Sequence, residues 1–310
     1  MVIEVSNLVK RYGDLIALDH FNLNVEEGEI FGLLGPNGSG KTTAINCMLA
    51  LLKYDKGSIR IFGTEMSPDA YEVKRNIGVV MQNVAVFEDL TVYENIRYFC
   101  GLYIRDRQKC EALTQEAIAF TGLSDYVKMK PKKLSGGLLR RLNIACGIAH
   151  KPKLIIMDEP TVAVDPQSRN NILEGIKKLS QNGTTVLYTS HYMEEVEQIC
   201  SKIAIMDQGH VIALGTKDEL KAMIKTGEKI TVEIIGLARE HLDALQKISH
   251  VERIQYENDL LEIHCAGGRH NLAEVLNYLN EKNLPFGRVY SEPPTLNDVF
   301  LEITGKELRD

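Results

Sequence analysis

A glycine-rich stretch near the start of the chain constrains the fold more than any other feature. An apolar segment typical of a strand, residues 29–34, precedes it, and residues 42–52 have a helical pattern. Glycines let the backbone curl so that successive N–H groups point at phosphate oxygens, and a helix N-terminus adds its positive dipole end. The sequence therefore predicts a phosphate-binding loop in an α/β domain, with a chance glycine-rich loop as the weaker alternative. The stretch reads Gly35-Pro36-Asn37-Gly38-Ser39-Gly40-Lys41-Thr42-Thr43.

Two side chains of this loop are predicted to act directly on a bound nucleotide. The positive charge of Lys41 would bind the β- and γ-phosphates, and the Thr42 hydroxyl would ligate Mg²⁺. ATP and Mg²⁺ are therefore the ligands that the loop predicts.

An apolar segment that ends in two carboxylates is the second candidate part of the site. Residues 154–157 are apolar and are followed by Asp158 and Glu159. Neighbouring side chains of a strand point in opposite directions, so the two acids can take separate roles. Asp158 is predicted to hold Mg²⁺, and Glu159 to act as general base on the attacking water. Such a pair alone is usually a solvated turn, but the phosphate-binding loop favours the functional interpretation.

Composition excludes several classes of protein. The formal net charge is −6, without the basic excess of a nucleic-acid binder, so we expect no nucleic acid as partner. No apolar run approaches the roughly 18 residues that cross a bilayer, so a role at a membrane would need another polypeptide. The six cysteines contain no Cys-x-x-Cys pair, which favours reduced thiols in a cytosolic protein.

The pattern of strands and helices predicts two domains. Residues 1–222 alternate apolar strands with helices, as in an α/β domain, and about 84–150 form a helical subdomain. After a linker at 223–227, residues 228–310 change to the order β-α-β-β-α-β, which predicts a small ferredoxin-like α+β domain. That domain shows no catalytic constellation, so its expected role is structural, dimerising or regulatory. Strands of the first domain are predicted at 29–34, 77–81, 154–157, 184–189 and 203–206.

Capping signals place two of the helices. Thr91 and Glu94 have capping-box spacing, which predicts a helix running toward Ile104. Thr295 and Asp298 have the same spacing and predict a last helix, after a last strand at 285–290.

A short stretch, Leu134-Ser135-Gly136-Gly137, carries the resemblance to a known protein family. It precedes a helical segment, 138–148, so its hydroxyl and N–H groups can form a second anion site. A Ser-Gly-Gly triplet alone is usually a plain turn. Its position after the phosphate loop and before the acidic strand, with His191 beyond, strongly resembles the ABC ATPase family over roughly residues 2–216.

The resemblance implies a shared nucleotide site. In that family the signature stretch of one subunit closes over the γ-phosphate held by the phosphate loop of the other, so two ATP molecules lie in a head-to-tail dimer. The chain would then be an ATPase that pairs with a second copy of itself or a related ATPase chain. The implied contacts of the second half of the site are Ser135, Gly136 and Gly137.

Four more residues take roles that the resemblance implies. Tyr12 matches the aromatic residue that stacks on adenine. Gln82 matches the glutamine that reaches Mg²⁺ and the attacking water, and it begins the segment that touches the membrane subunit. Asp165 matches a dimer-contact aspartate, although Asp165-Pro166 equally suits a helix N-cap. His191 matches the histidine that contacts the γ-phosphate.

Two positions depart from the family pattern. Leu138 stands where the family usually has glutamine, so no glutamine ligand is expected there. Val164 stands where leucine is usual, a mild change of volume.

The stretch 293–302 ends the small C-terminal domain, and Arg140-Arg141-Leu142 follows the signature stretch. This arrangement resembles the drug- and antibiotic-export branch of type-two ABC exporters. This branch implies a separate permease of about six spans, which hydropathy would identify, and a place on the cytoplasmic face of the cell membrane. A soluble ABC machine acting on DNA or ribosomes is one alternative, but 44–133 has no sustained heptads and the chain has one phosphate loop. A nucleotide kinase is the other, and it leaves the signature stretch unexplained.

Overall fold

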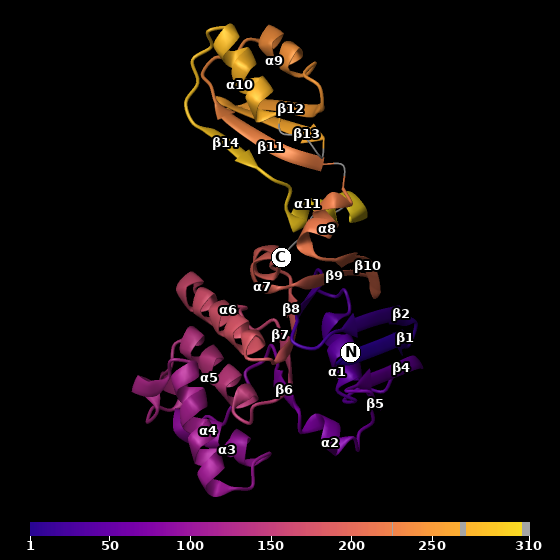
Figure 1. Ribbon diagram of the computed structural model, residues 1–310, viewed down its shortest axis with the longest axis vertical. Coiled ribbons are helices and arrows are strands. Elements are labelled where there is room, and N and C mark those ends of the chain that lie inside the picture. The colour runs from indigo at the N-terminus through magenta and orange to yellow at the C-terminus, as the bar shows by residue number, and fades with distance from the viewer. Residues whose placement is uncertain (225, 267–270, 306–310) are drawn as a thin grey trace. The chain divides into compact units, whose positions relative to one another are not determined.

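The computed structural model describes residues 1–224, 226–266 and 271–305, which divide into two compact units (Figure 1). The first unit covers Met1–Thr216, and the second begins at Lys217. The fold class predicted from the sequence is confirmed, because the first unit is a phosphate-loop α/β domain with a helical part and the second is a small α+β domain.

A six-stranded sheet forms the centre of the first unit. Its order is β10-β9-β3-β8-β7-β6, and all neighbours are parallel except the edge strand β10. Every residue of β3, β7 and β8 is buried, as expected for strands covered on both faces. The carboxyl ends of parallel strands lie at one edge, where open α/β sheets bind ligands. The strands are β3 Ile30–Leu34, β6 Ile77–Val80, β7 Leu154–Asp158, β8 Thr185–Ser190, β9 Lys202–Asp207 and β10 His210–Gly215.

A second, antiparallel sheet packs in the same unit and was not predicted from the sequence. Its order is β2-β1-β4-β5, and its bounds are β1 Ile3–Tyr12, β2 Leu15–Val25, β4 Lys56–Ile61 and β5 Thr64–Glu65. One apolar core joins this sheet, helix α1 (Lys41–Met48) and the parallel sheet. Helix α1 ends before the predicted Leu52, because the chain turns at Ala50, where φ is 51°. The short helix α2 (Tyr71–Lys74) follows this sheet.

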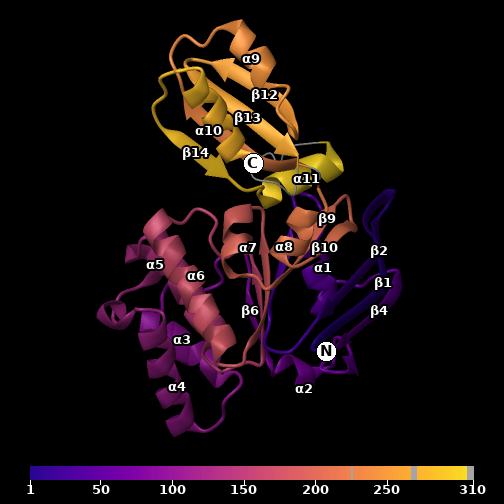
Figure 2. The same ribbon diagram turned by 45° about the horizontal axis from the view of Figure 1, so that its top comes forward.

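Helices gather on one side of the parallel sheet, opposite the antiparallel sheet (Figure 2). The predicted capping box is confirmed, since the Thr91 N–H donates to Glu94 Oε2 at 2.8 Å and the Glu94 N–H to Thr91 Oγ1 at 3.2 Å. The helix that follows ends at Gly101, one turn short of the prediction. These helices are α3 Val92–Gly101, α4 Arg107–Phe120, α5 Gly136–Ile148 and α6 Pro166–Gln181, and the short α7 Met193–Ile199 follows β8.

The second unit contains a four-stranded antiparallel sheet of order β12-β13-β11-β14. This order with the sequence β-α-β-β-α-β is the ferredoxin-like arrangement that was predicted. The last strand begins at Val289 rather than 285, and Pro285 has no N–H to give to a sheet ladder. The elements are α8 Lys217–Ala222, β11 Thr226–Glu233, α9 Arg239–Leu245, β12 Val251–Glu257, β13 Leu260–Ala266, α10 Leu272–Glu281, β14 Val289–Glu292 and α11 Leu296–Thr304.

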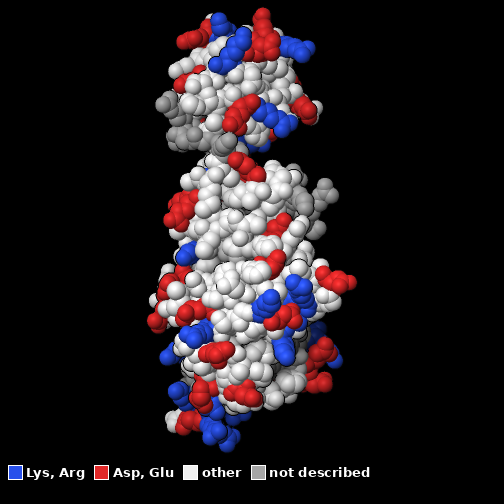
Figure 3. Space-filling model, turned by 90° about the vertical axis from the view of Figure 1, so that its right-hand side faces the viewer, with Lys and Arg blue, Asp and Glu red and all other residues white. Residues whose placement is uncertain are grey.

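The structure shows where the charged side chains and the cysteines lie. The face shown in Figure 3 carries acidic and basic side chains interspersed. All six cysteines lie in described residues, where they are buried and form no disulfide. Within the described ranges, no helix is both long and apolar enough to cross a membrane.

Candidate functional site

The phosphate loop joins β3 to α1, and close packing requires glycine at two of its positions. A Cβ on Gly35 would lie 2.4 Å from the carbonyl oxygen of Met206. At Gly40, φ is 108° and a Cβ would lie 2.7 Å from the carbonyl oxygen of Ala17. Real Cβ atoms do not approach backbone so closely, so the tight curl of the loop depends on these glycines.

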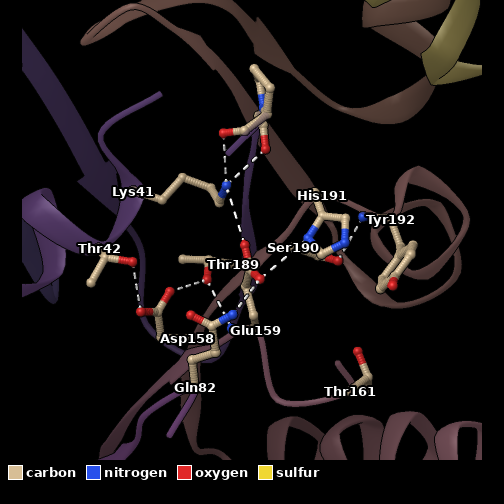
Figure 4. Close-up of polar contacts among 12 residues, drawn as sticks. Lys41, Thr42, Gln82, Asp158, Glu159, Thr161, Thr189, Ser190, His191 and Tyr192 are labelled. Atoms are coloured by element: carbon tan, nitrogen blue, oxygen red, sulfur yellow. Dashed lines mark hydrogen bonds and ion pairs between the residues drawn. The ribbon is translucent and has the colours of Figure 1, made fainter. Parts of the chain in front are cut away.

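Lys41 folds back across the loop that it ends (Figure 4). Its Nζ donates to the carbonyl oxygens of Gly35 at 2.8 Å and Pro36 at 3.1 Å, and lies 3.4 Å from Glu159 Oε1. Burial lowers the pKa of Lys41, and the charge of Glu159 opposes that shift. The loop thus carries a buried ammonium group held by three oxygens.

Asp158 is held by two hydroxyl groups from different elements. Thr42 Oγ1, in α1, donates to Asp158 Oδ2 at 2.9 Å, and Thr189 Oγ1, in β8, donates to Asp158 Oδ1 at 2.6 Å. The structure therefore brings two of the three predicted metal ligands, Thr42 and Asp158, into direct contact.

Three of the predicted side chains converge on the carboxylate of Glu159 (Figure 4). Gln82 Nε2 donates to Glu159 Oε2 at 3.3 Å, and His191 Nδ1 lies 3.2 Å from the same oxygen. Lys41 contacts the other oxygen. The backbone of Glu159 has φ of 47°, and its N–H donates to Thr189 Oγ1 at 3.0 Å. A non-glycine residue in this strained region is a mark of functional sites, and here the surrounding hydrogen bonds hold it.

A cavity of about 680 Å³ lies over the phosphate loop. Its walls include Tyr12, Gln82 and Glu159. Tyr12 ends β1 with 49% of its surface exposed, and Lys10 Nζ lies 5.0 Å from its ring centroid. The remaining lining residues are Leu15, Ile16, Ala17, Asn37, Gly38, Gly40, Lys41, Thr42, Thr43, Gln208 and Gly209.

The other predicted contacts lie at the starts of α5 and α6, and none lines this cavity. Ser135 is the N-cap of α5, and its Oγ accepts from the Leu138 N–H at 3.3 Å. Asp165 is the N-cap of α6, where the Ser168 N–H donates to Oδ1 at 2.9 Å and holds the pKa of Asp165 below its usual value. Both helix starts are capped as side chains of these types favour.

Gly137 allows the two helix starts to pack against each other. A Cβ on Gly137 would lie 2.5 Å from Ser168 Oγ, 2.8 Å from Ser168 Cβ and 3.2 Å from Asp165 Oδ2. A Cβ on Gly136 would meet only the carbonyl oxygen of Ala163, at an ordinary 3.7 Å. The packing therefore requires glycine at position 137 and leaves room for a larger residue at position 136.

Gly137→Ala is expected to destabilise the protein by about 1–3 kcal/mol, the usual cost of overpacking, and to lower the melting temperature. Gly136→Ala is the matched control and is expected to leave that temperature unchanged within error. Thermal unfolding followed by circular dichroism compares them, and equal melting temperatures would contradict the packing role of Gly137.

Several site residues were missed in the sequence. Thr189 and Ser190 end β8 directly before His191, so hydroxyl groups at a strand's carboxyl end were an available signal. Thr161 and Glu195 were also missed; they hydrogen-bond to each other at 2.8 Å, and Glu195 lies within the short helix α7, which was not predicted.

A glycine-rich loop at a parallel strand's carboxyl end, with a buried lysine and an acidic pair beside it, defines a P-loop nucleoside triphosphatase. Comparisons with known proteins narrow this class. Residues 18–162 match the family described as ABC transporter, and residues 215–304 match the family described as ATP-binding protein DrrA1-3-like, C-terminal domain.

Two curated relatives resemble the chain over nearly its whole length. It is 36% identical to the linearmycin resistance ATP-binding protein LnrL of Bacillus subtilis (strain 168), with 100% of both chains covered. It is 34% identical to the daunorubicin resistance ATP-binding protein DrrA3 of Streptomyces coeruleorubidus, covering 99% of this chain and 97% of the relative.

A solved structure resembles more than two thirds of the chain. The dimeric structure of a post-hydrolysis state of the ATP-binding cassette MJ0796 bound to ADP and Pi has a TM-score of 0.63 and 28% identity, and covers 69% of this chain and 98% of that one. The chain therefore belongs to the ATP-binding proteins of ABC transporters, and it is an ATPase.

Proposed function

We propose that this chain is the ATPase of an exporter and drives a separate membrane permease, with drug, antibiotic or lipid-like cargo. The names of its relatives support this function, because LnrL and DrrA3 are both resistance ATP-binding proteins. The DrrA1-3-like C-terminal domain supports the same branch. The permease would hold the chain at the cytoplasmic face of the cell membrane.

One observation carries the proposed arrangement of two ATPase chains. The signature stretch Ser135–Gly137 lies outside the cavity that contains the phosphate loop, so one chain supplies only one wall of a nucleotide site. A second copy, or a related chain, would bring its own Ser135, Gly136 and Gly137 over the γ-phosphate. Asp165, beside Gly137, would then contact the partner. Two ATP molecules are enclosed in such a dimer.

The phosphate loop and Tyr12 hold the nucleotide in this arrangement. Backbone N–H groups of the loop and the start of α1 bind the phosphates, and Lys41 gives up its carbonyl contacts for the β- and γ-phosphates. Tyr12, exposed at the rim of the cavity, stacks on the adenine.

The donors beside the loop fit Mg²⁺. The Thr42 hydroxyl donates to the Asp158 carboxylate, and both Thr42 and Gln82 line the cavity over the phosphate loop. Oxygen ligands of this kind suit a hard divalent cation, and an ion here would neutralise charge on the phosphates. Thr42, Asp158 and Gln82 would hold it.

Hydrolysis depends on the groups around Glu159. Its carboxylate accepts a proton from the attacking water, while the β–γ bond breaks and leaves ADP and phosphate. Gln82 donates a hydrogen bond to the carboxylate at Oε2, and His191, whose Nδ1 lies 3.2 Å from the same oxygen, also contacts the γ-phosphate. The rigid contacts keep the base in place for an in-line attack.

The permease contact is proposed for the 82–105 segment. Arg140, in α5, donates to the carbonyl oxygens of Met81 at 3.2 Å and Gln82 at 2.8 Å, so this segment is tied to the helix that the signature stretch begins. An aromatic patch lies further along it, with ring centroids of Phe87 and Tyr98 4.9 Å apart and those of Phe87 and Phe99 5.9 Å apart. Exposed aromatic side chains are enriched where proteins dock.

Tyr98→Asp tests this contact. It is expected to reduce the amount of permease retained at least about tenfold, because burying an unpaired charge costs more than 1.4 kcal/mol. Tyr290→Asp is the matched control, since Tyr290 is 48% exposed and Tyr98 is 47% exposed. The measurement is the amount of a co-expressed candidate permease, a chain with about six predicted spans, that co-purifies with each variant. Equal retention by both variants would contradict docking at the aromatic patch.

A further inference from the structure

A buried carboxylate lies behind the site, on α7. Glu195 is 2% exposed. Its Oε2 accepts hydrogen bonds from Tyr188 Oη at 2.7 Å, Thr161 Oγ1 at 2.8 Å and Ser190 Oγ at 3.1 Å. Its Oε1 forms an ion pair with Arg169 Nε at 3.2 Å. Buried carboxylates are costly unless they are paired in this way, so the cluster is a specific structure rather than a solvated face.

The partners of Glu195 come from the segments that carry the proposed catalytic groups. Thr161 lies two residues after Glu159, and Ser190 directly precedes His191. Arg169 lies in the first turns of α6, whose N-cap is Asp165, and its guanidinium carbon lies 4.7 Å from the Tyr192 ring centroid. The Glu195 carboxylate therefore links the turn after Glu159 to the turn at His191, and the side chains of Glu159 and His191 lie in contact.

The turn after Glu159 needs such a restraint. Glu159 and Ala163 both have positive φ, 47° and 59°, so this turn holds two non-glycine residues in a disfavoured region. The Thr161 hydroxyl, between them, is fixed by Glu195. On the other side, Ser190 Oγ also accepts from the Tyr192 N–H at 2.9 Å, which shapes the turn at His191 (Figure 4).

We propose that Glu195 is a positioning residue for ATP hydrolysis, which holds the Glu159 turn and the His191 turn in register through Thr161 and Ser190. Without the Glu195 carboxylate, the strained turn after Glu159 relaxes, and Glu159 Oε2 and His191 Nδ1 lose their 3.2 Å contact. Misplacement of a reacting group by about 1 Å can cost a factor of about 100 in rate. The contacts that hold the phosphate loop do not include Glu195, so nucleotide binding is preserved.

Glu195→Gln tests the proposal with little change of shape. It removes the charge that faces Arg169 and replaces an acceptor with a donor among three hydroxyl groups. The expected result is a fall in kcat of about 10- to 100-fold with the Kd for ATP within about twofold of wild type. Thr161→Val removes the hydroxyl that links the Glu159 turn to Glu195, together with its 3.3 Å contact with Tyr188 Oη, and is expected to lower kcat about tenfold. The double variant is expected to lose no more than Glu195→Gln alone, because both act through one contact.

Thr114→Val is the matched control. Thr114 is buried in α4, and its hydroxyl donates to the carbonyl oxygen of Cys110 at 2.8 Å, away from the site. It is expected to keep the wild-type kcat. The rate of phosphate release per folded molecule, with folding checked by circular dichroism, separates positioning from stability.

The outcomes are distinct. If Thr161→Val, or a folded Glu195→Gln, hydrolyses ATP within twofold of wild type, or if their losses multiply in the double variant, the positioning role is wrong. Should Glu195→Gln fail to fold, Thr161→Val alone decides by the same rate criterion. The inference rests on the proposed roles of Glu159 and His191. Full activity of Glu159→Gln would overturn those roles, whereas an inactive Glu159→Gln beside an active Glu195→Gln would overturn this inference alone.

Discussion

Glu159→Gln is expected to lower ATP turnover about 10²- to 10⁴-fold, the contribution typical of a general base. The amide keeps the shape of the side chain but cannot accept a proton from water. Binding of ATP is expected to persist, because the phosphate loop is unchanged and Lys41, 3.4 Å from Glu159, loses a competing anion. ATP is therefore trapped, and the dimeric state is favoured.

Three measurements check this variant. Phosphate release reports turnover, equilibrium binding of ATP reports the Kd, and light scattering with ATP reports the dimer. Glu194→Gln is the matched control, because Glu194 is an exposed carboxylate on the neighbouring helix α7 and is expected to have no effect. Turnover within tenfold of wild type in Glu159→Gln would contradict the assignment of the base.

Lys41→Ala is expected to produce the opposite pattern, a loss of binding. A hydrogen bond to a charged group contributes about 1.5–3 kcal/mol, so the Kd for ATP is expected to rise about 10- to 100-fold. The loss is larger in hydrolysis, because Lys41 also faces the charge that develops on the γ-phosphate. Isothermal titration with ATP checks the Kd, with the exposed Lys53→Ala as control. An unchanged Kd would remove Lys41 from the phosphate site.

The phosphate loop, the acidic pair and the capped helix at Thr91 could be predicted because their signals are local. A loop between a strand and a helix needs glycines within nine residues, and a capping box needs two side chains three apart. The meeting of Gln82, Glu159 and His191 followed from the family resemblance rather than from spacing. The structure shows their contacts within one chain.

Other features could not be predicted because they depend on residues far apart in the sequence. The antiparallel sheet pairs β1 with β4, some 50 residues along the chain, and no local pattern specifies such pairing. Glu195 lies in a short segment rich in glutamate, which is typical of an exposed helix face. Only the packing of α7 in the folded chain buries its side chain. The need for glycine at 137 arises from Ser168 on another helix.

In the proposed dimer, each nucleotide site combines the phosphate loop of one chain with the signature stretch of the other. Lys41→Ala disables the first part, and Ser135→Glu disables the second by setting a negative charge against the γ-phosphate. Each variant alone has two damaged sites in its dimer and is expected to be inactive. A mixed dimer of the two has one intact site.

The most direct measurement is therefore ATP hydrolysis by an equal mixture of the Lys41→Ala and Ser135→Glu chains. If the chains pair at random, half of the dimers are mixed. Each mixed dimer has one intact site of its two, so about a quarter of all nucleotide sites in the mixture are intact. The expected result is recovery of activity toward that level on mixing two inactive proteins. A mixture that stays as inactive as its parts would contradict the shared site.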